Sequence, residues 1–294
     1  MGNSTALPNG VIMSIRSLML ASLLAFGFSF AAEAVTPTSL QCLWATYKNF
    51  HISGDQRHIV FADQSTMPFS DGTADDFFRN ISVLLDNPTS LEQMFFIPYI
   101  FGFQKDAAGK YINPIPGINQ DPGRVRYERF FLKTYGASEA IVEKDLVLVK
   151  WVDGKKISFN KKFGASVALQ KVSDQLSALV AARPELKKYV ISPLGGTFNW
   201  RTVAGTKNLS VHSFGVAIDI NLDHTNYWKW ETERNGRIAY KNQIPLEVVE
   251  VFEKNGFIWG GKWYHYDTMH FEYRPELLMK AHDCETEFAK YREN

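Results

Sequence analysis

The stretch SVHSFGVAIDIN, residues 210–221, constrains the fold of this 294-residue chain more than any other. Its second half alternates between two classes of side chain, and this period of two predicts a strand whose successive side chains point to opposite faces. Ile218 and Ile220 would face a core, and Asp219 would lie on the other face beside the small side chain of Ala217. A carboxylate in a buried strand is unfavourable unless it is paired or binds a metal. The stretch therefore predicts a partner for Asp219.

Two histidines are candidates for that partnership. His212 lies seven positions before Asp219, in the segment that enters the strand, and Gly215 lets this segment turn tightly. A second stretch, DTMHFEY, places His270 in a strand-like run. Two imidazoles and one carboxylate on rigid strands leave one position open for water, which is typical of a catalytic zinc site. Non-haem iron uses the same ligand types, so these residues alone do not name the metal.

A hydrolytic metal site also needs a general base, and Asp267 stands three residues before His270. Such a carboxylate can take a proton from a water at the metal and pass it to a leaving amine. Taken singly, a histidine is more often a surface or hydrogen-bonded residue, and Asp267 would be an ordinary loop carboxylate. The combination favours a site. The other histidines keep the ordinary interpretation, although one of them, His265, is near enough in sequence to contribute.

Composition excludes some classes of function. The net charge is +1 with both signs spread along the chain, so no clustered basic surface for nucleic acid is indicated. Hydrophobic residues make up 45% and aromatic residues 14%, which is enough for a substantial core.

The N-terminus is typical of an export signal. Arg16 precedes the apolar run SLMLASLLAFGFSF, and Ala32 and Ala34 have the spacing of a cleavage site. We predict a signal peptide over residues 1–34, no membrane span after its removal, and a periplasmic or envelope-associated protein. The alternative is an uncleaved N-terminal anchor, for which the run is short.

Cys42 and Cys284 lie near the two ends of the mature chain. In an oxidising compartment they could form one disulfide, and two free buried thiols are the alternative. Two cysteines so far apart do not indicate a zinc–thiolate site.

The remaining patterns predict an α+β fold. Helical spacing over residues 166–182 stops before Pro184, and a second helix over 244–256 has Pro245 near its start. Strands are expected at 145–152, 189–192, 215–221 and 269–273, with a turn at PLGG, and this order favours a mostly antiparallel sheet flanked by helices. The run LEQMFFIPYIFGF fits a core helix, a strand or an exposed lid. We divide the mature chain into an N-terminal accessory region, 35–160, and a catalytic domain, 161–294.

The third and last of these strands, with the residues just before them, carry a known pattern, S-x-H-x-x-G-x-A-x-D followed by an acid three residues before a final histidine. It resembles the zinc peptidases of the M15 family, which comprises D-alanyl-D-alanine carboxypeptidases and L-alanyl-D-glutamate endopeptidases that act on bacterial cell-wall peptides. Every position of the pattern is filled here, by Ser210, His212, Gly215, Ala217, Asp219, Asp267 and His270. The acid is an aspartate, which is more similar to the endopeptidase branch. The resemblance covers about residues 165–280 and says little about 35–160.

The resemblance implies roles and a fold. The fold would be the DD-peptidase/hedgehog-like type, with one Zn²⁺ held by His212, Asp219 and His270. Arg201 would hold a substrate carboxylate through its forked guanidinium, although a structural ion pair is the alternative. Ser210 would hydrogen-bond substrate or merely cap a turn. Two nearby tryptophans, Trp259 and Trp263, would wall the pocket or belong to the core.

We therefore expect an exported zinc peptidase that hydrolyses peptidoglycan stem peptides, with Asp267 as its catalytic base. A carboxypeptidase and an endopeptidase share these residues, so the bond that is cut stays open. One alternative is a non-catalytic wall-binding protein with a structural zinc, against which Asp267 argues. A metal-dependent hydrolase that does not act on peptides is a third hypothesis.

Overall fold

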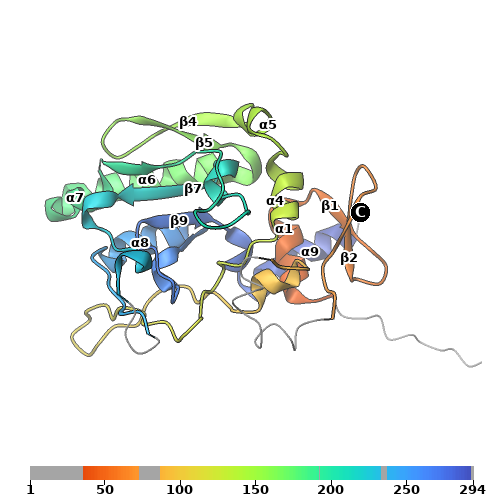
Figure 1. The fold of residues 1–294 in the computed structure, drawn as a ribbon, viewed down its shortest axis with the longest axis horizontal. Helices are drawn as coiled ribbons and strands as arrows, with labels where there is room; N and C mark the ends of the chain where they lie inside the picture. The colour runs from red at the N-terminus through yellow and green to blue at the C-terminus, as the bar shows by residue number, and fades with distance from the viewer. Residues whose placement is uncertain (1–35, 73–86, 192, 233–236, 293–294) are drawn as a thin grey trace, which may run out of the picture. The chain divides into compact units, whose positions relative to one another are not determined.

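The computed structural model describes residues 36–72, 87–191, 193–232 and 237–292 (Figure 1). Thr36–Asn294 form one compact unit. The predicted signal peptide, residues 1–34, lies outside the described residues. Among the described helices, none is both long enough and apolar enough to span a membrane.

A four-stranded antiparallel sheet carries the candidate site. Its strands, in spatial order, are β6 (Leu194–Gly196), β7 (Ala217–Asn221), β9 (His270–Tyr273) and β8 (Phe257–Trp259). In the register between β7 and β9, Asp219 lies directly opposite His270. Residues opposite each other in an antiparallel pair share a face of the sheet. The pairing alone therefore brings together two residues that are 51 positions apart in the chain.

Two helices pack against the apolar side of this region. They are α6 (Ala165–Ala182) and α8 (Leu246–Lys254), which also contact each other. Phe252 of α8 stacks on Phe271 of β9 with ring centroids 3.8 Å apart. Ile218 and Ile220 are fully buried, as their alternation predicts. This packing fixes the apolar face of the sheet and leaves the opposite face for the polar side chains.

The remaining elements complete an antiparallel α+β fold. A hairpin covers α6, and a small three-stranded sheet precedes it in sequence. The strands are β1 (Phe50–Ile52), β2 (His58–Phe61), β3 (Thr66–Pro68), β4 (Leu146–Lys150) and β5 (Lys156–Asn160). The helices are α1 (Thr38–Tyr47), α4 (Glu128–Tyr135), α5 (Glu139–Glu143), α7 (Lys187–Val190) and α9 (Ala281–Arg292). Every described strand pairing is antiparallel, which confirms the predicted α+β class with antiparallel pairing.

Residues 36–160 and 161–292 share one hydrophobic core. Phe131 of α4 lies 5.5 Å, centroid to centroid, from Phe214, which follows His212 in the chain. The two regions divided at residue 160 in the sequence are thus packed together around the same buried residues.

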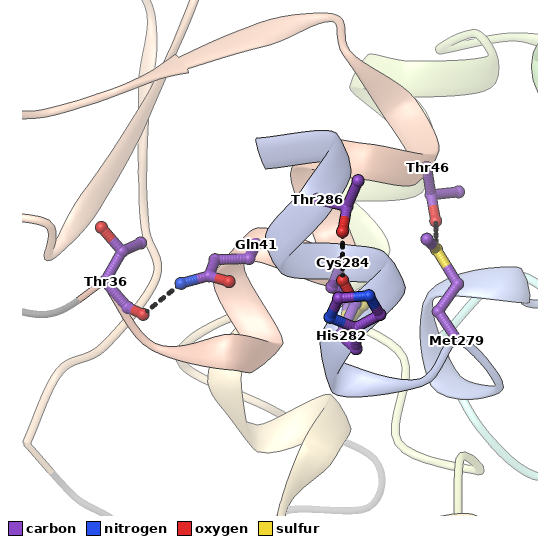
Figure 2. Close-up of a disulfide and its surroundings, with 8 residues drawn as sticks. Thr36, Gln41, Thr46, Met279, His282, Cys284 and Thr286 are labelled. Carbon is purple, nitrogen blue, oxygen red and sulfur yellow. Dashed lines mark hydrogen bonds between the residues drawn. A yellow bond between two sulfur atoms is a disulfide. The ribbon is translucent and has the colours of Figure 1, made fainter. Parts of the chain in front are cut away.

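The two ends of the described chain are joined covalently. A disulfide links Cys42 of α1 to Cys284 of α9, which confirms the bridge considered from the sequence. Figure 1 shows these helices side by side, and Figure 2 shows the surroundings of the bridge, where the Thr46 hydroxyl donates to the sulfur of Met279 at 3.7 Å.

Two local predictions were wrong. In the segment YVIS, expected as a strand, Tyr189 and Val190 form the end of the short helix α7, which follows a helical turn begun by Pro184, and Ser192 lies outside the described residues. The turn expected at PLGG contains β6 instead, because its backbone pairs with β7. Of the alternatives for residues 91–103, none describes the whole run. It begins as a short 3₁₀ turn, Glu92–Phe95, and continues without regular structure.

Candidate metal centre

Three donor atoms converge on the polar side of the sheet. Nε2 of His212 lies 3.2 Å from Nδ1 of His270 and 3.3 Å from Oδ1 of Asp219, and the last two atoms are 2.8 Å apart. Ligands bound to zinc at about 2.0–2.1 Å in tetrahedral geometry stand about 3.3 Å from one another. The predicted triad is therefore brought together with nearly the spacing that one small divalent ion requires.

In each histidine, the hydrogen bond made by the outer ring nitrogen determines which nitrogen faces the centre. Nδ1 of His212 lies 2.7 Å from the carbonyl oxygen of Thr197, and Nε2 of His270 lies 2.9 Å from Oε1 of Glu272. Both partners accept hydrogen bonds, so these nitrogens carry the protons. In the neutral rings, the lone pairs on the facing nitrogens then point toward each other and toward Asp219. Such second hydrogen bonds are what orient metal-binding histidines, and the donor set fits a divalent cation such as zinc.

A short 3₁₀ helix, Val211–Phe214, positions His212. The Ser210 hydroxyl caps this helix by accepting a hydrogen bond from the His212 backbone N–H at 3.4 Å. Gly215 ends it with φ of 65°, a left-handed conformation that glycine adopts without strain. A Cβ at Gly215 would lie 2.6 Å from a methyl group of Leu146, so the close approach also requires glycine.

Close strand packing positions Asp219. Its register partner in β6 is Gly196, and at the adjacent Gly195 a Cβ would lie 2.6 Å from Cβ of Asp219 and 2.9 Å from a methyl group of Leu222. The glycine-rich β6 therefore lies against the carboxylate-bearing strand without displacing it.

The charges of the triad are strongly coupled. Burial raises the pKa of Asp219, but His212 and His270 together outweigh it and hold the pKa well below its usual range. Burial likewise opposes the protonation of His270, but hydrogen bonds and charge from Asp219 and Glu272 raise its pKa to about 10. A metal that binds here must displace this proton.

Asp267 lies at the edge of the triad. Its backbone carbonyl accepts a hydrogen bond from the His270 N–H at 3.2 Å, and its Oδ1 atom is buried with no hydrogen-bond partner among the described residues. Burial and the charge of Asp219 raise the pKa of this carboxyl to about 7. A carboxyl with such a pKa can accept and return a proton near neutral pH.

Ser210 and Arg201 occupy adjacent backbone positions, since the Ser210 N–H donates to the Arg201 carbonyl at 2.9 Å. Ser210 is buried and acts as the cap described above. Arg201 is exposed, and its guanidinium donates to the Thr202 carbonyl at 3.4 Å. Within the part of the chain that the structure describes, Arg201 forms no ion pair, so the structural pairing considered from the sequence is not seen.

The tryptophans differ in position. Trp259 is fully buried and donates to the Thr268 carbonyl at 2.9 Å. Trp263 is nearly buried, and its ring lies 5.7 Å from that of His270. Trp259 is therefore a core residue, whereas Trp263 packs beside His270, one of the three candidate ligands.

Two carboxylates in this region were not predicted from the sequence, one that contacts the triad and one that contacts His265. Glu272 binds His270, and Asp121 accepts hydrogen bonds from the backbone and the ring of His265, both at under 3 Å from Asp121. Glu272 had a signal, because it follows His270 by two positions in a strand and so shares its face. Asp121 had none, because its partner is 144 positions away.

Two imidazoles and a carboxylate converge on one point with a second carboxyl beside them, which is the arrangement that a mononuclear metal-dependent hydrolase requires. Residues 204–273 match the family model described as D-alanyl-D-alanine carboxypeptidase, which supports an M15-family peptidase and confirms the resemblance. The matched segment contains the triad and Asp267, and it begins after Arg201. Comparison with curated proteins and with solved structures gave no significant match.

Proposed function

We propose that this protein is an exported, zinc-dependent peptidase that hydrolyses the stem peptides of peptidoglycan in the cell envelope. The observation that carries the proposal is the convergence of His212, Asp219 and His270 beside the buried, unpartnered Asp267 oxygen. The family match over this segment supports peptide hydrolysis as the reaction.

The chemistry that a bound zinc ion supplies is polarisation of the scissile carbonyl and a water of lowered pKa. Asp267 provides the proton transfer. Its Oδ1 atom accepts a proton as water attacks the carbonyl carbon, and it returns that proton to the amine nitrogen as the C–N bond breaks. The raised pKa of Asp267 suits both steps.

Arg201 is the proposed contact for the substrate. Its exposed guanidinium is adjacent to Ser210 at the start of the metal-binding segment. A forked guanidinium bonds both oxygens of a peptide carboxylate, and stem peptides carry such groups. Ser210 would contribute a hydrogen bond to the substrate in addition to its role as a cap.

Export is supported by two features. The sequence of residues 1–34 is typical of a secretory signal, and the Cys42–Cys284 disulfide is typical of an oxidising compartment. The proposed location is therefore the periplasm or the cell envelope.

Purified protein incubated with peptidoglycan fragments tests the proposal. We expect new peptide fragments by mass spectrometry, abolition of cleavage by a chelator, and recovery on addition of Zn²⁺. The masses of the products identify the bond that is cut. A metal-loaded protein that leaves all stem peptides intact would contradict the proposal and favour the wall-binding alternative.

A further inference from the structure

The metal centre continues beyond its ligands along strand β9. Side chains two positions apart in a strand share a face, so His270 and Glu272 lie on one face of β9 and Phe271 and Tyr273 on the other, and Arg274 directly follows the strand. Glu272 is fully buried, and its Oε1 atom accepts the hydrogen bond from Nε2 of His270 at 2.9 Å. The orientation of the His270 ring thus depends on where this carboxylate is held.

Arg126 holds that carboxylate from a distant part of the chain. Its Nε atom lies 3.0 Å from Oε1 and 3.1 Å from Oε2 of Glu272, and its Nη2 atom also donates to Oε1. The two residues are 146 positions apart, and Arg126 precedes α4 in the N-terminal region. A guanidinium that contacts a carboxylate through two nitrogens fixes its plane as well as its position.

The Arg126 guanidinium is itself held in place. It lies 5.6 Å from the ring centroid of Trp263, the tryptophan that also packs on His270. The Trp263 indole N–H donates to the carbonyl of Pro122 at 2.7 Å. The segment around Arg126 therefore contacts both the carboxylate that binds His270 and the aromatic ring beside it.

Arg274 does not substitute for Arg126. Its closest approach to Glu272 is 3.7 Å, between Nη1 and Oε2. It is instead bonded to Glu276 at 2.5 Å and to the carbonyl of Gly123 at 3.2 Å. Among these cations, Arg126 alone makes direct hydrogen bonds to Glu272.

We propose that Arg126 is a positioning residue of the metal centre, which acts through Glu272 to keep Nδ1 of His270 directed at the ion. The inference rests on the proposed function, since it requires a metal at the triad. It gives residues 36–160 a part in the site, because they supply the group that orients one of its ligands.

The test measures metal affinity rather than activity. Zn²⁺ affinity is determined by competition with a chromophoric chelator, and Co²⁺ binding is followed by its visible absorption. We expect Arg126→Met to weaken binding of both ions by about 10- to 100-fold and to change the Co²⁺ spectrum, because partners of metal ligands typically contribute this much. Arg126→Lys should lie between this variant and the unmodified protein, since lysine keeps the charge but not the forked contact.

Lys262→Met is the matched control. Lys262 forms a buried ion pair with Glu253 at 2.5 Å, so its removal also leaves a buried carboxylate without its cation, but neither residue contacts a ligand. This variant should be less stable and bind both ions with unchanged affinity. Equal loss of affinity in Lys262→Met and Arg126→Met would overturn the proposal, because the effect would then be general destabilisation.

A double-mutant cycle tests whether Arg126 acts through Glu272. In a Glu272→Leu background, Arg126→Met should have no further effect on metal affinity, and additive losses would overturn the proposed route. Should Arg126→Met fail to fold, Arg126→Lys replaces it in the cycle. If the unmodified protein binds neither ion, the proposed function is contradicted. If folded Arg126→Met binds metal as tightly as the unmodified protein, only this inference is contradicted.

Discussion

At the scale of single residues, Asp267 distinguishes an enzyme from a protein that only binds metal. A buried carboxylate oxygen without a hydrogen-bond partner is unfavourable, and a structural zinc site would not need it. Asp267→Asn preserves the size of the side chain and removes the proposed base. We expect kcat to fall by about 10²- to 10⁴-fold in a stem-peptide assay, with bound Zn²⁺ retained by elemental analysis.

The control for this substitution is Asp223→Asn, which removes an exposed carboxylate just beyond β7. Its kcat should be unchanged. Cleavage by Asp267→Asn at the unmodified rate would show that another group transfers the proton.

A second carboxylate, Asp121, is expected to contribute a pH-dependent stability. Burial raises the pKa of Asp121, but hydrogen bonds from His265 and the charge of Arg124 outweigh it, so the pKa is lower in the folded protein. A carboxyl whose pKa is lower in the folded protein stabilises the fold at pH values above its pKa in the unfolded chain, about 3.9. This contribution is lost as the pH falls through the pKa of the carboxyl in the folded protein. Urea unfolding should therefore show that Asp121→Asn lowers the free energy of unfolding most above about pH 5.

The difference in free energy of unfolding between Asp121→Asn and the unmodified protein should then become smaller as the pH falls below about 4. The exposed-site variant Asp223→Asn provides the baseline for a lost surface charge. A difference in unfolding free energy that stays constant from neutral to acidic pH would show that Asp121 stabilises the protein by shape alone.

At the scale of elements, the strands with a clear alternation were predictable and the short connecting elements were not. The period of two at Ile218 and Ile220 identified β7, and the helical spacing that stops before Pro184 identified α6. Strand β6 consists of Leu-Gly-Gly and has no intrinsic preference for a strand. It forms because its backbone pairs with β7, which is a tertiary effect that a local pattern does not contain.

The residues of the candidate site were likewise predictable only where a local sequence pattern contains them. The candidate ligands and Asp267 follow a spaced pattern within residues 210–270, so the sequence predicted them as one group, and the structure brings the three candidate ligands together. Arg126 reaches Glu272, and Asp121 reaches His265, only because residues 36–160 share the core of the site, and no local pattern links residues more than 140 positions apart. The alternation in MHFEY contained a usable signal for Glu272, since it places this residue on the same face as His270.

The close packing of β6 on β7 leads to a prediction for Gly195. Gly195→Ala would introduce a methyl group 2.6 Å from Cβ of Asp219, so the two strands must separate at a metal ligand. Overpacking of this kind destabilises proteins by about 1–3 kcal/mol. We expect Zn²⁺ affinity to fall by about tenfold in a chelator competition assay, which corresponds to about 1.4 kcal/mol.

Gly54→Ala is the matched control, because a Cβ at Gly54 would meet no atom within 4 Å. Its metal affinity and its unfolding midpoint should be close to those of the unmodified protein. Unchanged affinity in Gly195→Ala would mean that β6 yields without moving Asp219.

At the scale of the whole molecule, the two ends of the described chain are tied to each other and to the last strand of the site. The Tyr47 hydroxyl of α1 donates to Glu276 at 3.2 Å, and Glu276 in turn binds Arg274 at the end of β9. Close to these contacts, the Cys42–Cys284 disulfide closes a loop of 242 positions. The bridge therefore joins α1 to α9 at a place that, among the described residues, none of the three candidate ligands contacts directly.

Removal of this disulfide should lower stability and spare the metal centre. In the chain-entropy model a bridge across so long a loop stabilises chiefly by restricting the unfolded chain, and native bridges typically contribute about 2–5 kcal/mol. We expect Cys42→Ser/Cys284→Ser to lose about this much in urea unfolding, while the folded protein binds Zn²⁺ with unchanged affinity. A reducing agent should shift the unfolding midpoint of the unmodified protein toward that of the double variant and leave the variant itself unaffected. If the double variant instead lost metal affinity at urea concentrations where it is still folded, the bridge would be coupled to β9 through Tyr47 and Glu276 rather than acting on the unfolded chain.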